Sequence, residues 1–296
     1  MIYPRMLPLL LLAVWLPAAG QKVPVLPVQY EELTSPQFVQ AVKSSQATCI
    51  IPIGIMEKHG PHLPLGTDLI DARKIALTAA AREYAVVFPP YYFGQINEAK
   101  HQPGTVAYSH ELVWNILQET CEELARNGMK KIILVNGHGG NNYLLRYFCQ
   151  VQLERRHDYA VLLFAPAEDE AFTKKIAAMR KTQTGGHADE TETAMMLSHR
   201  PELVHLDQAN TQSGADQARL AELPFLFTGI WWYARFPNHY AGDGAPAQAE
   251  LGRLLIEHEV EQLVKMIASV KADAKVLPFQ QEFYNQAEQP LETRPE

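Results

Sequence analysis

The sequence KIILVNGHGGNN, at residues 131–142, is the most informative segment about the architecture of this chain. Its first six residues are almost continuously apolar, which is typical of a parallel strand buried on both faces. A histidine flanked by glycines follows directly, and the next predicted helix begins at residue 141. In an open parallel sheet, the loops that follow the strands meet at one edge and form the ligand-binding crevice. The segment therefore predicts an α/β fold with a site at the end of this strand.

The same alternation of strand and helix extends along most of the chain. Further strands are predicted at residues 47–53, 86–88 and 160–165, and helices at residues 71–84, 110–127, 141–157 and 247–270. This spacing is typical of a sheet with crossover helices. No internal repeat or low-complexity linker interrupts it. We therefore predict one three-layer αβα domain with a mostly parallel central sheet at residues 21–275, followed by a C-terminal tail rich in Gln, Glu and Pro at residues 276–296.

Length and composition exclude several classes of protein. The chain has 296 residues, of which 47% are hydrophobic, so it can bury a large core and is not a disordered chain. Its 33 acidic residues outnumber 26 basic ones, and a net charge of −7 argues against a nucleic-acid partner. The three cysteines are too few and too far apart for a disulfide framework or a cysteine-based zinc site.

The N-terminal segment MIYPRMLPLLLLAVWLPAAG, residues 1–20, has the three parts of a secretory signal peptide. Arg5 supplies the positive charge, an apolar run follows, and small residues precede Gln21. The run is shorter than the ~20 residues of a membrane span, which favours a signal peptide over the alternative interpretation, an uncleaved membrane anchor. We expect cleavage, a secreted or periplasmic protein, and no membrane segment in the mature chain.

Three clusters of His, Asp and Glu follow or lie between the predicted elements. They are EKHGPHLPLGTD at residues 57–68, GHGGNN at 137–142 and GGHADETET at 185–193. Imidazole and carboxylate without thiolate are the ligand set of Zn²⁺, Mn²⁺ or Fe²⁺ in hydrolytic centres. One such cluster alone is more often a solvated loop or an acidic helix start. Three clusters that meet at one edge of a sheet predict a metal centre.

Together, four motifs resemble those of the creatininase (creatinine amidohydrolase) family. They are IGIMEKHGPHLPLGTD at residues 53–68, HQPGT at 101–105, NGHGGN at 136–141 and HADETET at 187–193, with a looser match in GDGAP at 242–246. The resemblance extends from about residue 47 to residue 267 and implies an αβα amidohydrolase with two divalent metal ions. It also implies a homo-oligomer that cleaves the C–N bond of a small cyclic or linear amide. Zinc and manganese are the expected metals, and iron(II) is an alternative.

The resemblance also implies roles for individual residues. Glu57 would bind one metal and His59 the other, while Asp68 would bridge both ions and His138 would complete the first site. His187 would be the acid/base group that delivers a proton to the leaving nitrogen. A histidine suits that task because its ordinary pKa lies near ~6.5.

One position departs from creatininase itself. Creatininase has a glutamate metal ligand two positions after the histidine of the NGH turn, where this chain has Gly140. The departure argues against creatinine as the substrate and leaves the second metal short of a carboxylate. Glu192 is our candidate for that carboxylate, and Glu190 is the alternative. Residues two apart on a helix point in different directions, so only one of the two should face the metals.

The sequence also leaves the roles of four further residues and two alternative functions open. His62 and His101 are expected near the mouth of the site, in a structural role or in contact with substrate. For Trp231 and Trp232, core packing or a subunit contact is favoured over a pocket wall. A hydrolase of a cyclic keto-sugar or inositol-type substrate could use the same metals, and a non-catalytic exported metal-binding protein is a third class. A full ligand set together with the additional His187 favours an enzyme that hydrolyses an amide with a metal-bound hydroxide.

Overall fold

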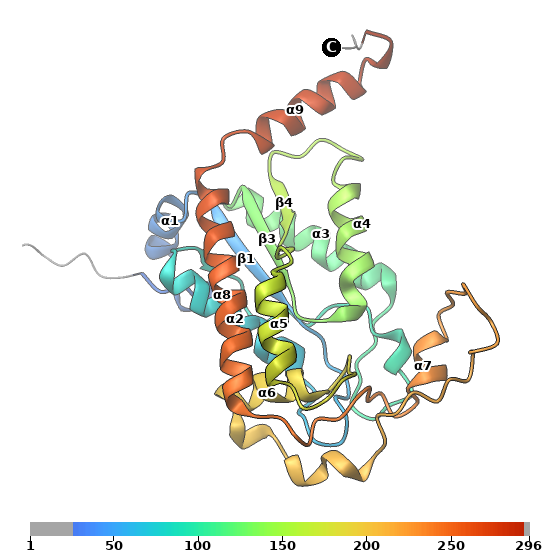
Figure 1. Ribbon diagram of the computed structural model, residues 1–296. Coiled ribbons are helices and arrows are strands. Elements are labelled where there is room, and N and C mark those ends of the chain that lie inside the picture. The colour runs from blue at the N-terminus through green and yellow to red at the C-terminus, as the bar shows by residue number, and fades with distance from the viewer. Residues whose placement is uncertain (1–25, 293–296) are drawn as a thin grey trace, which may run out of the picture.

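A parallel sheet of four strands, in the order β2-β1-β3-β4, forms the centre of the computed structural model, which describes residues 26–292 (Figure 1). The strands are β1 (Thr48–Ile53), β2 (Val86–Val87), β3 (Lys131–Asn136) and β4 (Ala160–Leu163). All three pairings between neighbouring strands are parallel. The predicted signal peptide, residues 1–20, lies outside the described residues. Within residues 26–292, no helix is both long and apolar enough to cross a bilayer.

Helices cover both faces of the sheet, which confirms the predicted three-layer αβα fold. One face is covered by α1 (Ser35–Ser44), α3 (His110–Arg126) and α4 (Asn142–Val151). The other face is covered by α2 (Thr67–Arg82) and α8 (Ala249–Ala272). The remaining helices are α5 (Glu170–Met179), α6 (Glu190–His199), α7 (Trp231–Arg235) and α9 (Val276–Ala287).

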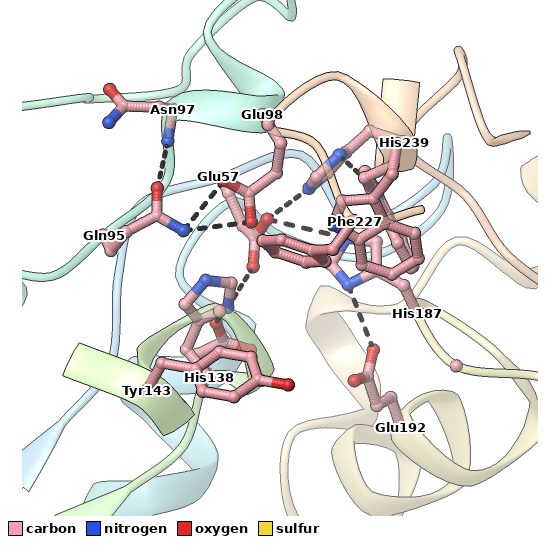
Figure 2. A pocket seen from close by; sticks show the side chains of 17 residues that line it. Glu57, Gln95, Asn97, Glu98, His138, Tyr143, His187, Glu192, Phe227 and His239 are labelled. Carbon is pink, nitrogen blue, oxygen red and sulfur yellow. Dashed lines mark hydrogen bonds and ion pairs between the residues drawn. The ribbon is translucent and has the colours of Figure 1, made fainter. Parts of the chain in front are cut away.

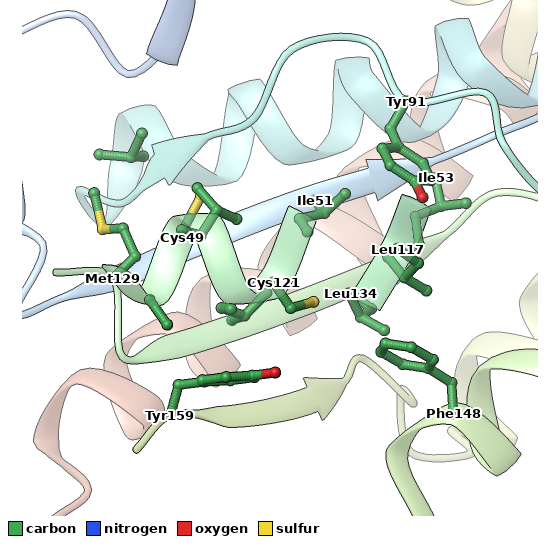
Figure 3. Packing of buried hydrophobic residues seen from close by; sticks show 14 of the residues in the cluster. Cys49, Ile51, Ile53, Tyr91, Leu117, Cys121, Met129, Leu134, Phe148 and Tyr159 are labelled. Atoms are coloured by element: carbon green, nitrogen blue, oxygen red, sulfur yellow. The ribbon is translucent and has the colours of Figure 1, made fainter. Parts of the chain in front are cut away.

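The burial of β1 explains why its sequence is apolar throughout. All six of its residues are buried, because successive side chains point to opposite faces and both faces are covered. Cys49, Ile51 and Ile53 pack against α3 and α4, where they contact a cluster that includes Leu117 (Figure 3). Ile50 points the other way and packs among the side chains of α2 and α8.

The prediction of a tail after residue 275 is wrong in its secondary structure. Residues of this segment form α9, whose Tyr284 is buried and donates a hydrogen bond to the Gln152 carbonyl at 2.6 Å. The amide side chain of Gln280 donates to the Tyr159 carbonyl at 2.8 Å. A composition rich in Gln suggests a solvated tail, but Tyr284 and Gln280 bind backbone carbonyls near the end of α4 and the start of β4 instead.

Candidate metal centre

The site lies at the carboxyl ends of β1 and β3, where the first turn of α2 packs closely against the chain. Gly137 directly follows β3, and a Cβ atom at this position would lie 2.6 Å from the Asp68 carbonyl oxygen. The glycine therefore permits an approach that any other residue would block. As a result, Asp68 in the first turn of α2 lies beside His138, the residue after Gly137.

Three buried side chains converge at a first position. The Nδ1 atom of His138 lies 2.9 Å from Oε1 of Glu57 and 3.1 Å from Oδ2 of Asp68. Neither of these two carboxylate oxygens has a hydrogen-bond partner, although both are buried. Buried polar atoms without partners are costly, and metal coordination removes that cost. The three side chains therefore fit a divalent cation.

A second position adjoins the first through the other oxygen of Asp68. The Nε2 atom of His59 lies 2.9 Å from Oδ1 of Asp68 and 4.0 Å from Oε2 of Glu192. Asp68 thus offers one oxygen toward each of two imidazoles, His59 and His138 (2.9 and 3.1 Å). This is the arrangement that a carboxylate between two metal ions requires.

The carboxylates of the cluster favour positive charge nearby. Burial opposes ionisation of His59, but the adjacent Asp68 raises its pKa to about 10. Burial likewise opposes the charge on His138, yet Glu57 and Asp68 raise its pKa well above the usual range. Against the effect of burial, His138 and His187 lower the pKa of Glu57. The centre therefore attracts cations, whether protons on imidazoles or metal ions.

His187 is buried at the edge of this centre. Its Nε2 atom donates a hydrogen bond to the Lys58 carbonyl at 2.8 Å, which leaves Nδ1 3.9 Å from Oε2 of Glu192. Burial lowers the pKa of His187 to about 3, so the ordinary histidine pKa assumed from the sequence does not hold in this environment. Glu57, His59 and His187 also bring their donor atoms within 4.8 Å of one another, so the geometry admits His187 as a ligand.

Glu190 and Glu192 differ in their surroundings, as their spacing predicts. Asp189 caps the N-terminus of α6, and Glu192 lines the cavity, where burial raises its pKa to about 8. Glu190 does not line the cavity. It is buried, and its carboxylate accepts hydrogen bonds from the backbone N–H groups of Lys181 and Thr182. Of the two candidates, Glu192 is therefore the one whose carboxylate lies at the cavity.

His239 belongs to the site but was missed from the sequence. Its Nε2 atom hydrogen-bonds Oε2 of Glu57, and its Nδ1 atom accepts from the Trp232 indole N–H at 2.9 Å (Figure 2). The residue has φ of +50°, a conformation more common for His and Asn than for most other residues. The sequence offered only a weak signal, a lone histidine after Pro237 and Asn238, outside every motif.

Most residues of the centre line a cavity of about 530 Å³, namely Glu57, Asp68, His138, His187, Glu192 and His239. Tyr143, Phe227, Trp231 and Trp232 line it too, so the preference for core packing or a subunit contact at the two tryptophans is corrected: both contribute to a pocket wall. His62 and His101 do not line the cavity. His62 is buried against the Thr193 hydroxyl at 2.8 Å, and His101 bonds the Pro237 carbonyl at 2.9 Å.

Buried imidazoles and carboxylates at the carboxyl edge of a parallel sheet, open to a cavity, define a three-layer α/β protein with a candidate centre for two metal ions. The family model for creatininase, described as creatinine amidohydrolase, matches residues 31–267. The chain belongs to the creatininase family.

Relatives in this family carry different functional names. Creatinine amidohydrolase from Pseudomonas putida is 27% identical over 60% of this chain and 74% of its own length. A mycofactocin precursor peptide peptidase from Mycobacterium ulcerans is 30% identical over 76% of this chain and 86% of its own. A 3-dehydro-scyllo-inosose hydrolase from Thermotoga maritima is 25% identical over 82% of this chain and 83% of its own.

Solved structures support the fold. A manganese form of creatininase and a mutant of zinc–zinc type each match with a TM-score of 0.71, at 21% and 22% identity. Each match covers 83% of this chain and 99% of the other. At this identity, the likeness establishes the shared fold.

Proposed function

We propose that this protein hydrolyses the C–N bond of small amides at a centre of two divalent metal ions. The observation that carries the proposal is Asp68, whose two oxygens lie 2.9 and 3.1 Å from the imidazoles of His59 and His138. A buried carboxylate placed between two imidazoles at the edge of a cavity is suited to bridge two metal ions.

The residues fit two ions, which we assign as zinc or manganese. Glu57, Asp68 and His138 would hold the first ion, and Asp68, His59 and Glu192 the second. Imidazole and carboxylate suit both metals, and the solved creatininase structures include manganese and zinc–zinc forms. When bound, such ions lower the pKa of water toward ~7 and polarise a carbonyl oxygen.

His187 is the group to which we assign proton transfer. Its Nε2–H is held by the Lys58 carbonyl, so Nδ1 is the acceptor atom on the side of Glu192. In that state Nδ1 can take a proton from the attacking water and deliver it to the leaving amide nitrogen, which is a poor leaving group without a proton. The competing assignment exchanges the roles of His187 and Glu192, and metal content in variants of each distinguishes the two.

His239 is assigned as a positioning residue for Glu57. An indole N–H is only a donor, so the Nδ1 atom that accepts from Trp232 carries no proton. The proton of the neutral ring then lies on Nε2, which donates to Oε2 of Glu57. This leaves Oε1 of Glu57 for the metal. Hydrogen bonds of this kind, to ligands rather than metals, fix ligand orientation.

An assay with defined substrates tests the proposed reaction. The full chain, loaded with Mn²⁺ or Zn²⁺, would be offered linear amides, lactams, dipeptides and a cyclic keto-inositol, with His138→Ala as the inactive control. We expect release of amine or ammonia from members of the amide series. Cleavage of the keto-inositol alone would move the protein to the inosose-type reaction named for the Thermotoga relative. Metal binding without hydrolysis of any substrate would favour the metal-binding class.

A further inference from the structure

One carboxylate that lines the cavity, that of Glu98, has no role in the proposed reaction. Glu98 lies in the short helical turn Asn97–Ala99 and lines the cavity (Figure 2). The side-chain amide of Gln95 donates to both of its oxygens, at 3.2 and 2.9 Å. Gln95 is itself fixed, because its backbone N–H donates to Oδ1 of Asn141 at 2.8 Å. The Glu98 carboxylate is therefore held in place toward the cavity.

No positive side chain offsets this charge. Within the described part of the chain, the only side chain that hydrogen-bonds the Glu98 carboxylate is the neutral amide of Gln95, and no Lys, Arg or His forms an ion pair with it. In the metal-bound centre, the two divalent ions would lie against Glu57, Asp68 and Glu192. Glu98 would then be the carboxylate of the cavity that contacts neither a cationic side chain nor an assigned metal ion.

Gly140 leaves space between Glu98 and His138. A Cβ atom at Gly140 would lie 2.9 Å from Oε1 of Glu98 and 2.3 Å from Nε2 of His138. That Nε2 atom is buried and has no hydrogen-bond partner. The Glu98 carboxylate, which has no cationic partner, thus lies close to Nε2 of His138, which has no hydrogen-bond partner. The buried ring nitrogen lacks a polar partner, and each carboxylate oxygen can accept a further hydrogen bond from a ligand.

Aromatic rings also line this cavity. Tyr143 is 79% exposed and Phe227 is 72% exposed, and their ring centroids lie 6.3 Å apart in an edge-to-face arrangement. Large exposed aromatic side chains beside a cavity indicate a binding surface. Their faces attract both apolar groups and cations.

We propose that Glu98, together with Tyr143 and Phe227, forms a subsite for a protonated amine of the substrate. The preferred substrates are then amides that carry an ammonium group near the scissile bond and an apolar or aromatic body. A cavity of about 530 Å³ is large enough for an aromatic amino-acid amide. This inference rests on the proposed function, because it concerns the substrate held at the same centre.

A pair of matched amides tests the subsite. Phenylalaninamide and 3-phenylpropanamide differ only in the amine, so the ratio of their kcat/KM values measures recognition of the ammonium group. We expect the zinc-loaded chain to prefer phenylalaninamide. Glu98→Gln should lower the ratio of kcat/KM values about 10- to 100-fold, which corresponds to the loss of one hydrogen bond to a charged group. Glu111→Gln, an exposed residue on α3, is the control for the loss of one negative charge.

A binding measurement separates the failure of this inference from that of the proposed function. Calorimetry of the zinc-loaded chain would compare 2-phenylethylamine with 2-phenylethanol. Glu98→Gln should weaken binding of the amine relative to the alcohol, and Phe227→Ala should weaken binding of both. If no amide is hydrolysed but the amine preference depends on Glu98, only the proposed reaction fails. An amine preference unchanged in Glu98→Gln overturns the subsite, as does loss of zinc in that variant, which would make Glu98 a metal ligand.

Discussion

Replacing Gly140 by alanine tests the geometry of the centre with the smallest available change. The new Cβ would lie 2.3 Å from Nε2 of His138, whereas ordinary contacts between such atoms are about 3.5 Å. The imidazole must therefore move by about 1 Å, and sites of this kind tolerate only about 0.5 Å. Since Nδ1 of the same ring is a proposed ligand, we expect the affinity for zinc to fall about 10- to 100-fold.

The neighbouring glycine provides a matched control. A Cβ at Gly139 would have no atom within 4 Å, although Gly139 and Gly140 belong to the same short turn. The dissociation constant for Zn²⁺, from competition with a chelator, would be measured for Gly139→Ala, Gly140→Ala and the unaltered chain. Thermal unfolding without metal would check that both variants are folded. Equal zinc affinity in Gly139→Ala and Gly140→Ala would refute the proposed position of His138.

Three further predictions follow from the site and the N-terminal segment. His187→Ala should lower turnover by roughly 10²–10⁴ while metal content stays unchanged, and Glu192→Ala should lower metal content; elemental analysis showing the opposite pattern would exchange their roles. Trp232→Phe removes the donor that fixes His239 and should weaken zinc binding by about 10-fold or more; a dissociation constant equal to that of the unaltered chain would contradict this. The exported protein should begin at Gln21, and N-terminal sequencing that recovers the uncleaved segment would disprove cleavage.

Local sequence was sufficient where structure depends on neighbours along the chain. The run at residues 131–136 predicted β3 to the residue, because burial on both faces makes its four central residues apolar. The alanine-rich run predicted a helix from residue 71, but α2 begins at Thr67. The four added residues include Asp68, whose negative charge suits the first turn of a helix. The helix therefore begins inside the motif at residues 57–68, which the sequence analysis placed before the helix.

Contacts between distant segments could not be predicted in the same way. His239 bonds Glu57 across 182 positions, and no spacing rule connects a lone histidine to a carboxylate that far away. The Glu98 carboxylate is likewise fixed by a hydrogen bond from Gln95, and the backbone of Gln95 is held in turn by Asn141 in the turn after β3. Such residues become visible only when the fold has brought the loops together.

Metal dependence tests the central claim most directly. The full chain would be stripped with a chelator and titrated with Mn²⁺ or Zn²⁺ while amide hydrolysis and bound metal are measured together, with Asp68→Ala in parallel. We predict no hydrolysis without metal, activity that reaches its plateau at two ions per chain, and loss of both bound metal and activity in Asp68→Ala. Full hydrolysis by the metal-free chain, or full metal content in Asp68→Ala, would contradict the assignment of this centre.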